Sequence, residues 1–190
     1  MKKKRIFILA VMLICLALAA TGTLAYFNAD DQVHNVITSG NIAIDLIEQK
    51  QLEDGSLVPY TNPVDVMPGT DVSKIVTVQN TGVGDAWIRV SVDSTVTFQT
   101  PTDAAPQDGD VVLNFDTENW VLKDDYYYYT KPVAANGVTA PLFTTVSFSP
   151  KMGNIYQGSK LDIVIQAQGV QAANNGSTVL EAAGWPSSNS

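Results

Sequence analysis

The stretch Leu161-Asp162-Ile163-Val164-Ile165-Gln166-Ala167 decides the fold class, because its largest apolar residues recur at every second position. A period of two with β-branched residues is typical of a β-strand that buries one face. We therefore predict a strand here, with Leu161, Ile163, Ile165 and Ala167 facing a core.

The same pattern recurs along most of the chain after residue 40. Further strands are predicted over residues 42–46, 72–79, 88–93, 111–115, 120–122, 126–130 and 142–148. Turn signals such as Pro68-Gly69, Asp108-Gly109-Asp110 and Asn136-Gly137 separate them. Roughly seven to nine short strands with this punctuation predict an all-β fold, a single antiparallel β-sandwich. At most one short helix is expected near the C-terminus, over residues 177–183.

The first residues predict export. Residues 2–5 are basic, residues 6–20 form an unbroken apolar run, and small residues follow up to Ala25. This is the layout of a cleavable signal peptide, with the cut expected between Ala25 and Tyr26. An uncleaved anchor is the alternative, but the run is shorter than the roughly 20 residues of a membrane span.

This interpretation divides the chain into three parts. Residues 1–25 are a signal peptide, residues 26–40 an N-terminal arm, and residues 41–190 the sandwich domain. We expect contact with a membrane only through the signal peptide, before its removal.

Charge limits the partners of the mature chain. The whole chain has 11 basic and 19 acidic side chains, and removal of residues 1–25 leaves 7 basic ones, a formal net charge of −12. Such a surface repels nucleic acids and anionic membranes. It fits an extracellular protein, and weak binding of cations stays open.

Several segments together resemble the TasA/camelysin family. They include Ala25-Tyr26-Phe27-Asn28 and the later block Val76-Thr77-Val78-Gln79-Asn80-Thr81-Gly82, followed by Trp87-Ile88-Arg89-Val90. Residues 35–42, 67–71, 126–132, 141–144, 156–158 and 167–172 are also similar to shared segments. The resemblance covers almost the whole chain in order.

The resemblance implies a jelly-roll-like sandwich that is exported and trimmed by a signal peptidase of the SipW type. It also implies a secreted structural protein of the cell surface or biofilm matrix of a Gram-positive-type bacterium. Its partners would be copies of itself or related matrix proteins, and the arm of one subunit would complete a sheet of the next.

In this reading the donor segment is residues 26–38, with Tyr26, Phe27, Val33 and Val36 as its assembly residues. The alternatives are that the arm pairs with its own domain as an edge strand, or that it stays loose.

Catalysis is not expected, although the family also carries a metallopeptidase label. A catalytic zinc usually takes two or three histidines, and this chain has one histidine, His34. We predict no metal site, no cofactor and no catalytic residue. The paired carboxylates Asp108 with Asp110 and Asp124 with Asp125 are interpreted as turn residues.

The run Tyr126-Tyr127-Tyr128-Tyr129 is the last candidate site. Successive side chains of a strand point to opposite faces, so one tyrosine pair can enter the core while the other lies on the surface. An exposed pair beside Trp120 or Trp185 would form an aromatic patch for sugar rings, as in an adhesin-like binding module. The simpler interpretation is that these tyrosines stabilise cross-strand neighbours.

Overall fold

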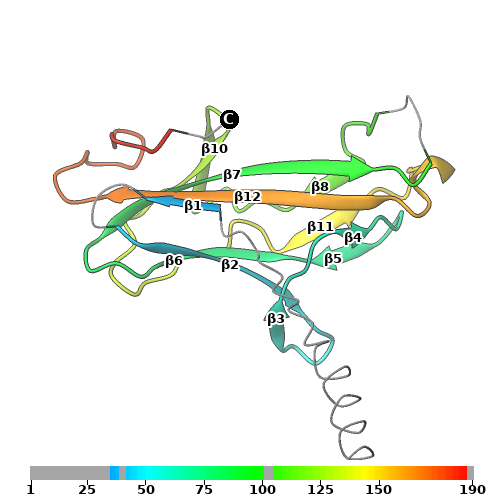
Figure 1. Ribbon diagram of the computed structural model, residues 1–190, viewed down its shortest axis with the longest axis horizontal. Coiled ribbons are helices and arrows are strands. Elements are labelled where there is room, and N and C mark those ends of the chain that lie inside the picture. Colours follow the sequence, from blue (N-terminus) through cyan, green and yellow to red (C-terminus); the bar gives the residue numbers. More distant parts are fainter. Residues whose placement is uncertain (1–34, 39–41, 101–104, 188–190) are drawn as a thin grey trace, which may run out of the picture. The chain divides into compact units, whose positions relative to one another are not determined.

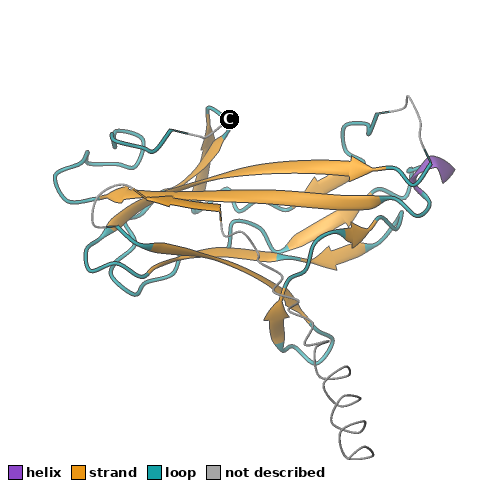
Figure 2. Cartoon of the chain, viewed as in Figure 1, coloured by secondary structure: helices purple, strands orange, loops and turns teal. Residues whose placement is uncertain are grey.

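The computed structural model describes residues 35–38, 42–100 and 105–187, and its regular structure is almost entirely β-strand (Figure 2). Contacts divide the chain into two compact units, residues 1–33 and 34–190, and the fold below is that of the second. The predicted signal peptide, its cleavage point and most of the arm lie outside the described residues.

The large sheet is built on its two longest strands. β7 (Ala86–Thr97) and β12 (Lys160–Gln171) pair antiparallel along their whole length, with Ala86 opposite Gln171 and Thr97 opposite Lys160. They run side by side in Figure 1. The remaining strands of this sheet are β10 (Tyr126–Tyr129) and β9 (Trp120–Lys123) beyond β7, and β1 (Asn35–Thr38) and β4 (Val64–Asp65) on the free edge of β12.

Two three-stranded sheets form the opposite layer (Figure 1). One has the order β3 (Leu57–Pro59), β2 (Ile44–Gln51), β6 (Ile75–Asn80), and the other has the order β5 (Asp71–Ser73), β11 (Thr145–Phe148), β8 (Val111–Leu113). Backbone hydrogen bonds from Leu142 N to Val76 O (2.8 Å) and from Lys74 N to Thr144 O (3.0 Å) join them edge to edge. The predicted all-β sandwich is therefore confirmed.

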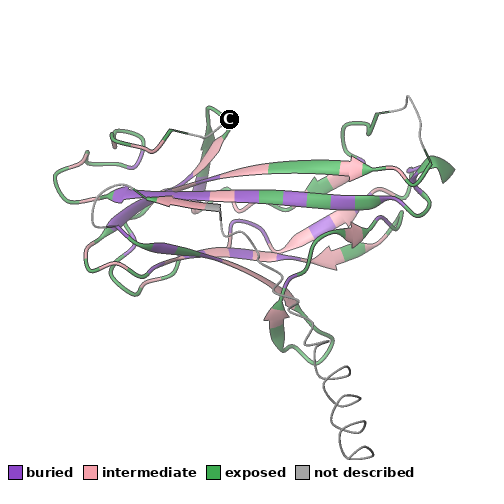
Figure 3. Ribbon diagram, in the orientation of Figure 1, coloured by how far each residue is buried: buried purple, intermediate pink, exposed green. Residues whose placement is uncertain are grey.

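The core lies between the two layers. Burial alternates along β12 as predicted, with Leu161, Ile163, Ile165 and Ala167 all buried (Figure 3). Burying an aliphatic side chain of this size contributes about 1.5–3 kcal/mol, so this one strand fixes the orientation of the large sheet.

Regular structure departs from the predicted pattern in two places. β1 pairs with β12 in parallel, whereas the other strand pairs of the described residues are antiparallel. The strand predicted from residue 142 begins only at Thr145. The Asn114 side chain explains the late start, because its Oδ1 accepts the backbone N–H groups of Thr144 and Thr145 that a neighbouring strand would otherwise bond.

No helix forms over residues 177–183, which agrees with the expectation of at most one short helix there. These residues form turns, and the helical element of the described chain is a 3₁₀ turn at Asn154–Tyr156. Side chains take the backbone groups that a helix would use: Asn175 bonds Ala183 through both its amide atoms, and Glu181 accepts the N–H of Ser177. Such local side-chain bonds compete with helix formation.

Candidate functional site

The edge of β12 that does not pair with β7, called here its free edge, is covered by several short segments. β4 covers it at Lys160 and Leu161, and β1 covers Gln166 to Gly169. Between these two strands, the Asn62 side-chain amide donates to the carbonyl of Ile163 at 2.9 Å, in place of a backbone group. The edge of this twelve-residue strand is thus covered in short, separate pieces.

β1 carries the part of the predicted donor segment that the structure describes. Val36 lies opposite Ala167, is half-buried and packs against the main core. Ile37, opposite Gln168, points to the other face of the sheet. The arm therefore pairs with its own domain over residues 35–38. Tyr26, Phe27 and Val33 lie outside the described residues.

Two tyrosines of the predicted aromatic patch belong to the core. Tyr127 stacks on Phe115 with ring centroids 4.2 Å apart and an interplanar angle of 17°. Tyr129 packs on the buried Trp120 at 5.0 Å, and its hydroxyl accepts the N–H of Ala140. Tyr127 and Tyr129 therefore form an inner pair that faces the core, as the predicted alternation requires. Trp120 packs with this inner pair.

The outer pair, Tyr126 and Tyr128, surrounds an arginine. The guanidinium carbon of Arg89 lies 3.9 Å from the ring centre of Tyr126 and 4.7 Å from that of Trp185. Arg89 also donates to the hydroxyl of Tyr128 at 3.1 Å. An arginine between two aromatic faces gains cation–π attraction, and here it occupies the ring faces that a sugar would need.

Gln168 lies next to this arginine on the same face of the sheet. Its Oε1 accepts from Nε of Arg89 at 2.8 Å, and the residue is fully buried. Its Nε2 has no hydrogen-bond partner among the described residues. Removal of Arg89 would therefore leave both polar atoms of this side chain without a partner.

The C-terminal segment, residues 172–187, covers this outer face. Trp185 packs edge-on against Tyr128 at 5.7 Å, and the indole N–H of Trp87 donates to the carbonyl of Asn175 at 3.0 Å. A second, smaller core forms beneath the segment from Trp87, Tyr128, Val170 and Val179, with Tyr126, Ala172, Ala182 and Trp185 around it.

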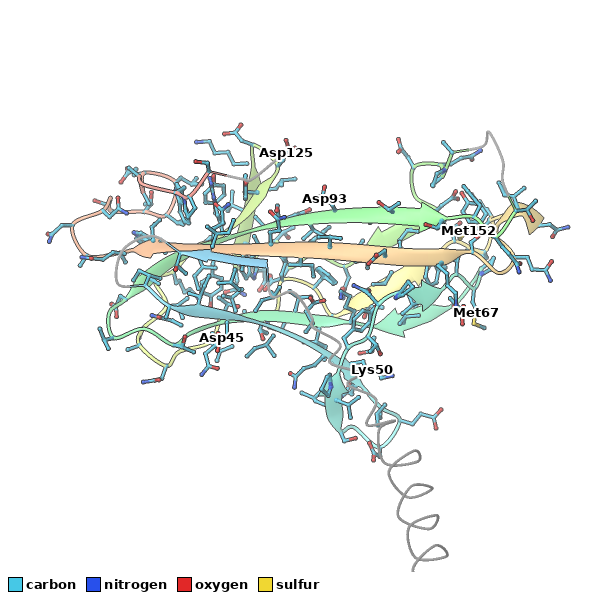
Figure 4. All side chains as sticks on the ribbon, in the orientation of Figure 1. Asp45, Lys50, Met67, Asp93, Asp125 and Met152 are labelled. Carbon is cyan, nitrogen blue, oxygen red and sulfur yellow. The ribbon has the colours of Figure 1, made fainter. Side chains whose placement is uncertain are left out.

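An open hollow of about 600 Å³ borders Tyr126 on the same face. Asp93 from β7 and Asp125 from the β9–β10 turn both line it, and Figure 4 labels both. Ser91, Gln166 and Asp124 add further hydrogen-bonding groups. Asp124 and Asp125 form the turn itself with φ angles of 49° and 65°, so the turn interpretation agrees with their conformation.

Asp110 has a local structural role. It accepts the N–H of Gln107 at 2.9 Å and the hydroxyl of Tyr156, which lies in the core. The hydrogen bond from Tyr156 holds the pKa of Asp110 below its usual value. Asp110 thus ties the loop before β8 to the 3₁₀ turn.

Sequence reasoning missed two polar groups, Arg89 and Lys74. Arg89 lies in β7 and Lys74 directly precedes β6, and their neighbours at every second position are buried or partly buried. The sequence did contain a signal for both groups, namely a basic residue within an alternating apolar pattern. Among residues 35–38, 42–100 and 105–187, no three His, Cys, Asp or Glu side chains gather in a way that could hold a metal ion.

Comparison with protein-family models, with curated proteins and with solved structures found no match. Within the described residues, none of the helical structure is long and apolar enough to cross a membrane.

Proposed function

We propose that this chain is a secreted structural protein of a bacterial cell surface or biofilm matrix, and that its copies assemble into fibres by strand addition at the free edge of β12. One observation carries the proposal. A four-residue strand, β1, covers part of the edge of a twelve-residue strand by parallel pairing. Parallel pairs are slightly less stable per residue than antiparallel ones, and a strand of four residues makes few pairing hydrogen bonds.

Strand addition between copies needs only the kind of hydrogen bond that is already present within one copy. The arm of a second copy can make the same main-chain hydrogen bonds to β12 that β1 makes within one copy. Each copy has one donor arm and one acceptor edge, so the contact is head-to-tail. Head-to-tail contacts that do not close into a ring continue as filaments.

The register specifies which side chains such an arm would bury. Asn35 pairs with Gln166, so a strand continued toward its N-terminus would place Val33 opposite Val164, which is 41% exposed. Val36 and Val33 are three residues apart and face opposite sides of a regular strand. Val36 would anchor the arm in the core, whereas Val33 would cover Val164 on the outer face.

Deletion of residues 26–38 tests the assembly. Negative-stain electron microscopy of the purified mature chain should show fibres that disappear in the deletion variant, while circular dichroism still shows a folded sandwich. Val36→Asp should act like the deletion, because it places a charge in the core. Val83→Asp, at a position that is 90% exposed and lies outside β1 and β12, is the control and should still form fibres. Identical fibres from the deletion variant would refute strand addition.

Export is the second element of the proposal. The basic start and apolar run of residues 2–20 support it, as does the formal net charge of −12 that remains after residue 25. N-terminal sequencing of the protein from culture medium should begin at Tyr26. Recovery of a chain that still contains residues 6–20 would contradict cleavage.

A binding module for a surface polymer is the second candidate function. The hollow beside Tyr126 favours it, since carboxylates and amides next to an aromatic ring can bind sugar hydroxyls. Asp125→Asn together with Tyr126→Ala should then weaken retention on the producing cell wall. Val83→Ser, at a position that is 90% exposed and does not line the hollow, is the control. Equal retention of both variants would exclude this function. Neither proposal includes enzymatic activity.

A further inference from the structure

Lys74 is a lysine inside the sandwich. It lies between β5 and β6, in the inward register that it shares with Val76 and Val78, and its side chain is 0% exposed. Its Nζ contacts the Glu48 carboxylate and lies 3.6 Å from the ring centre of Tyr60. Lysine is almost never fully buried unless it is paired, and here Glu48 is the partner.

Glu48 reaches Lys74 from the neighbouring strand. It lies on β2 opposite Val76, which makes Lys74 its diagonal neighbour across the β2–β6 pair. The Glu48 side chain is 16% exposed. The described residues contain one other lysine–carboxylate pair, Lys160 with Asp65, and its side chains are 49% and 66% exposed. The two pairs share their chemistry but differ in access to water.

Burial favours the uncharged form of Lys74. Desolvation lowers the pKa of Lys74, and the charges of Glu48 and Asp162 oppose this effect. Transfer of one proton from the ammonium to the carboxylate gives a neutral amine beside a neutral carboxylic acid. A medium with little water favours that neutral pair far more than bulk water does. These are the two forms that can condense.

We propose that Lys74 and Glu48 become joined by an intramolecular amide bond. The lone pair of Nζ attacks Cδ of Glu48, a carbon–nitrogen bond forms, and a carbon–oxygen bond to the carboxyl hydroxyl breaks. One proton leaves the nitrogen, joins that hydroxyl and departs with it as water. Nothing is oxidised or reduced, so the step needs no co-reactant.

One neighbour supports the step. The Tyr60 ring lies over Nζ, and Tyr60 itself is 1% exposed. It therefore shields the new amide from the water that would hydrolyse it.

The bond would close a loop over residues 48–74. This part of the chain contains β3 and β4 and crosses from the small sheet to the edge of β12. A covalent link here holds the crossing in place under load or denaturant, independently of whether the chain forms fibres.

Tryptic digestion with mass spectrometry of the purified, denatured chain tests the bond. Trypsin cuts after lysine, but an amide at Lys74 blocks the cut there. The expected product is the peptide that ends at Lys50 joined to residues 51–89, lighter by one water than the two peptides together. Lys74→Arg should abolish this product. Asp162→Asn, at an exposed position outside the pair, is the control variant and should leave this product unchanged.

The exposed pair is the internal control, because Lys160 should be cut normally in every sample. A folded wild-type chain that trypsin cuts after Lys74 once denatured, with both peptides at their unmodified masses, would overturn the proposal and leave an ordinary buried ion pair.

Discussion

Replacement of Arg89 by methionine should destabilise the sandwich without disturbing its main core. Methionine keeps most of the apolar stem but removes the guanidinium that lies between Tyr126 and Trp185. It also removes the donor to Oε1 of Gln168, a fully buried residue.

The expected loss of unfolding free energy follows from these contacts. A buried acceptor left without its donor costs about 1–3 kcal/mol. Loss of cation–π contact with two rings adds about 1 kcal/mol. The sum is about 3 kcal/mol of unfolding free energy. With a urea dependence of about 2 kcal/mol per molar, the unfolding midpoint should fall by about 1.5 M.

Urea titration followed by tryptophan fluorescence measures the shift. Arg89→Lys should fall between wild type and Arg89→Met, because lysine keeps the charge but cannot stack as a plane. Lys160→Met, which breaks the exposed pair with Asp65, is the control and should change stability by less than about 1 kcal/mol. A midpoint for Arg89→Met within about 0.3 M of wild type would refute the reasoning.

Three further predictions concern the core and its ionisable groups. Leu142→Ala should cost about 2–5 kcal/mol in urea unfolding, because Leu142 is fully buried and truncation leaves a cavity. Tyr127→Ala should destabilise the fold more than Tyr126→Ala by at least about 1 kcal/mol, since only Tyr127 packs against the main core. Burial, with the charges of Glu48 and Asp162, raises the pKa of Tyr60 to about 12, so the folded state holds this proton more tightly than the unfolded state. Stability should accordingly fall by roughly 1–2 kcal/mol as the pH rises from about 10 to about 12, and Tyr60→Phe should remove that part of the loss in unfolding experiments across this range.

The strand faces could be predicted from the sequence because alternation is a local property. Leu161, Ile163 and Ile165 face the core as expected, and the four tyrosines divide into an inner and an outer pair. Burial of Gln168 could not be predicted in this way. Its position marks it as outward-facing, and it is buried only because residues 172–187 return over that face.

The C-terminal segment gave no periodic signal of its own. Its shape depends on bonds such as that from the indole of Trp87 to Asn175, which join positions far apart in the sequence. The inward direction of Lys74 was present in the pattern of β6, but its partners come from β2 and from the crossing at Tyr60. Local periodicity therefore predicts which way a side chain points, whereas its partners follow from the topology.

The β7–β12 pair has a consequence for the order of folding. Residues 86–97 find their partners at residues 160–171, so the central ladder joins distant parts of the chain. Such non-local pairing forms slowly, since a long loop must close before any contact is gained. A chain that emerges with its N-terminus first cannot complete this ladder until residue 171 has appeared. Until then the large sheet lacks the strand that joins β7 to β1 and β4, so the two layers of the sandwich cannot close.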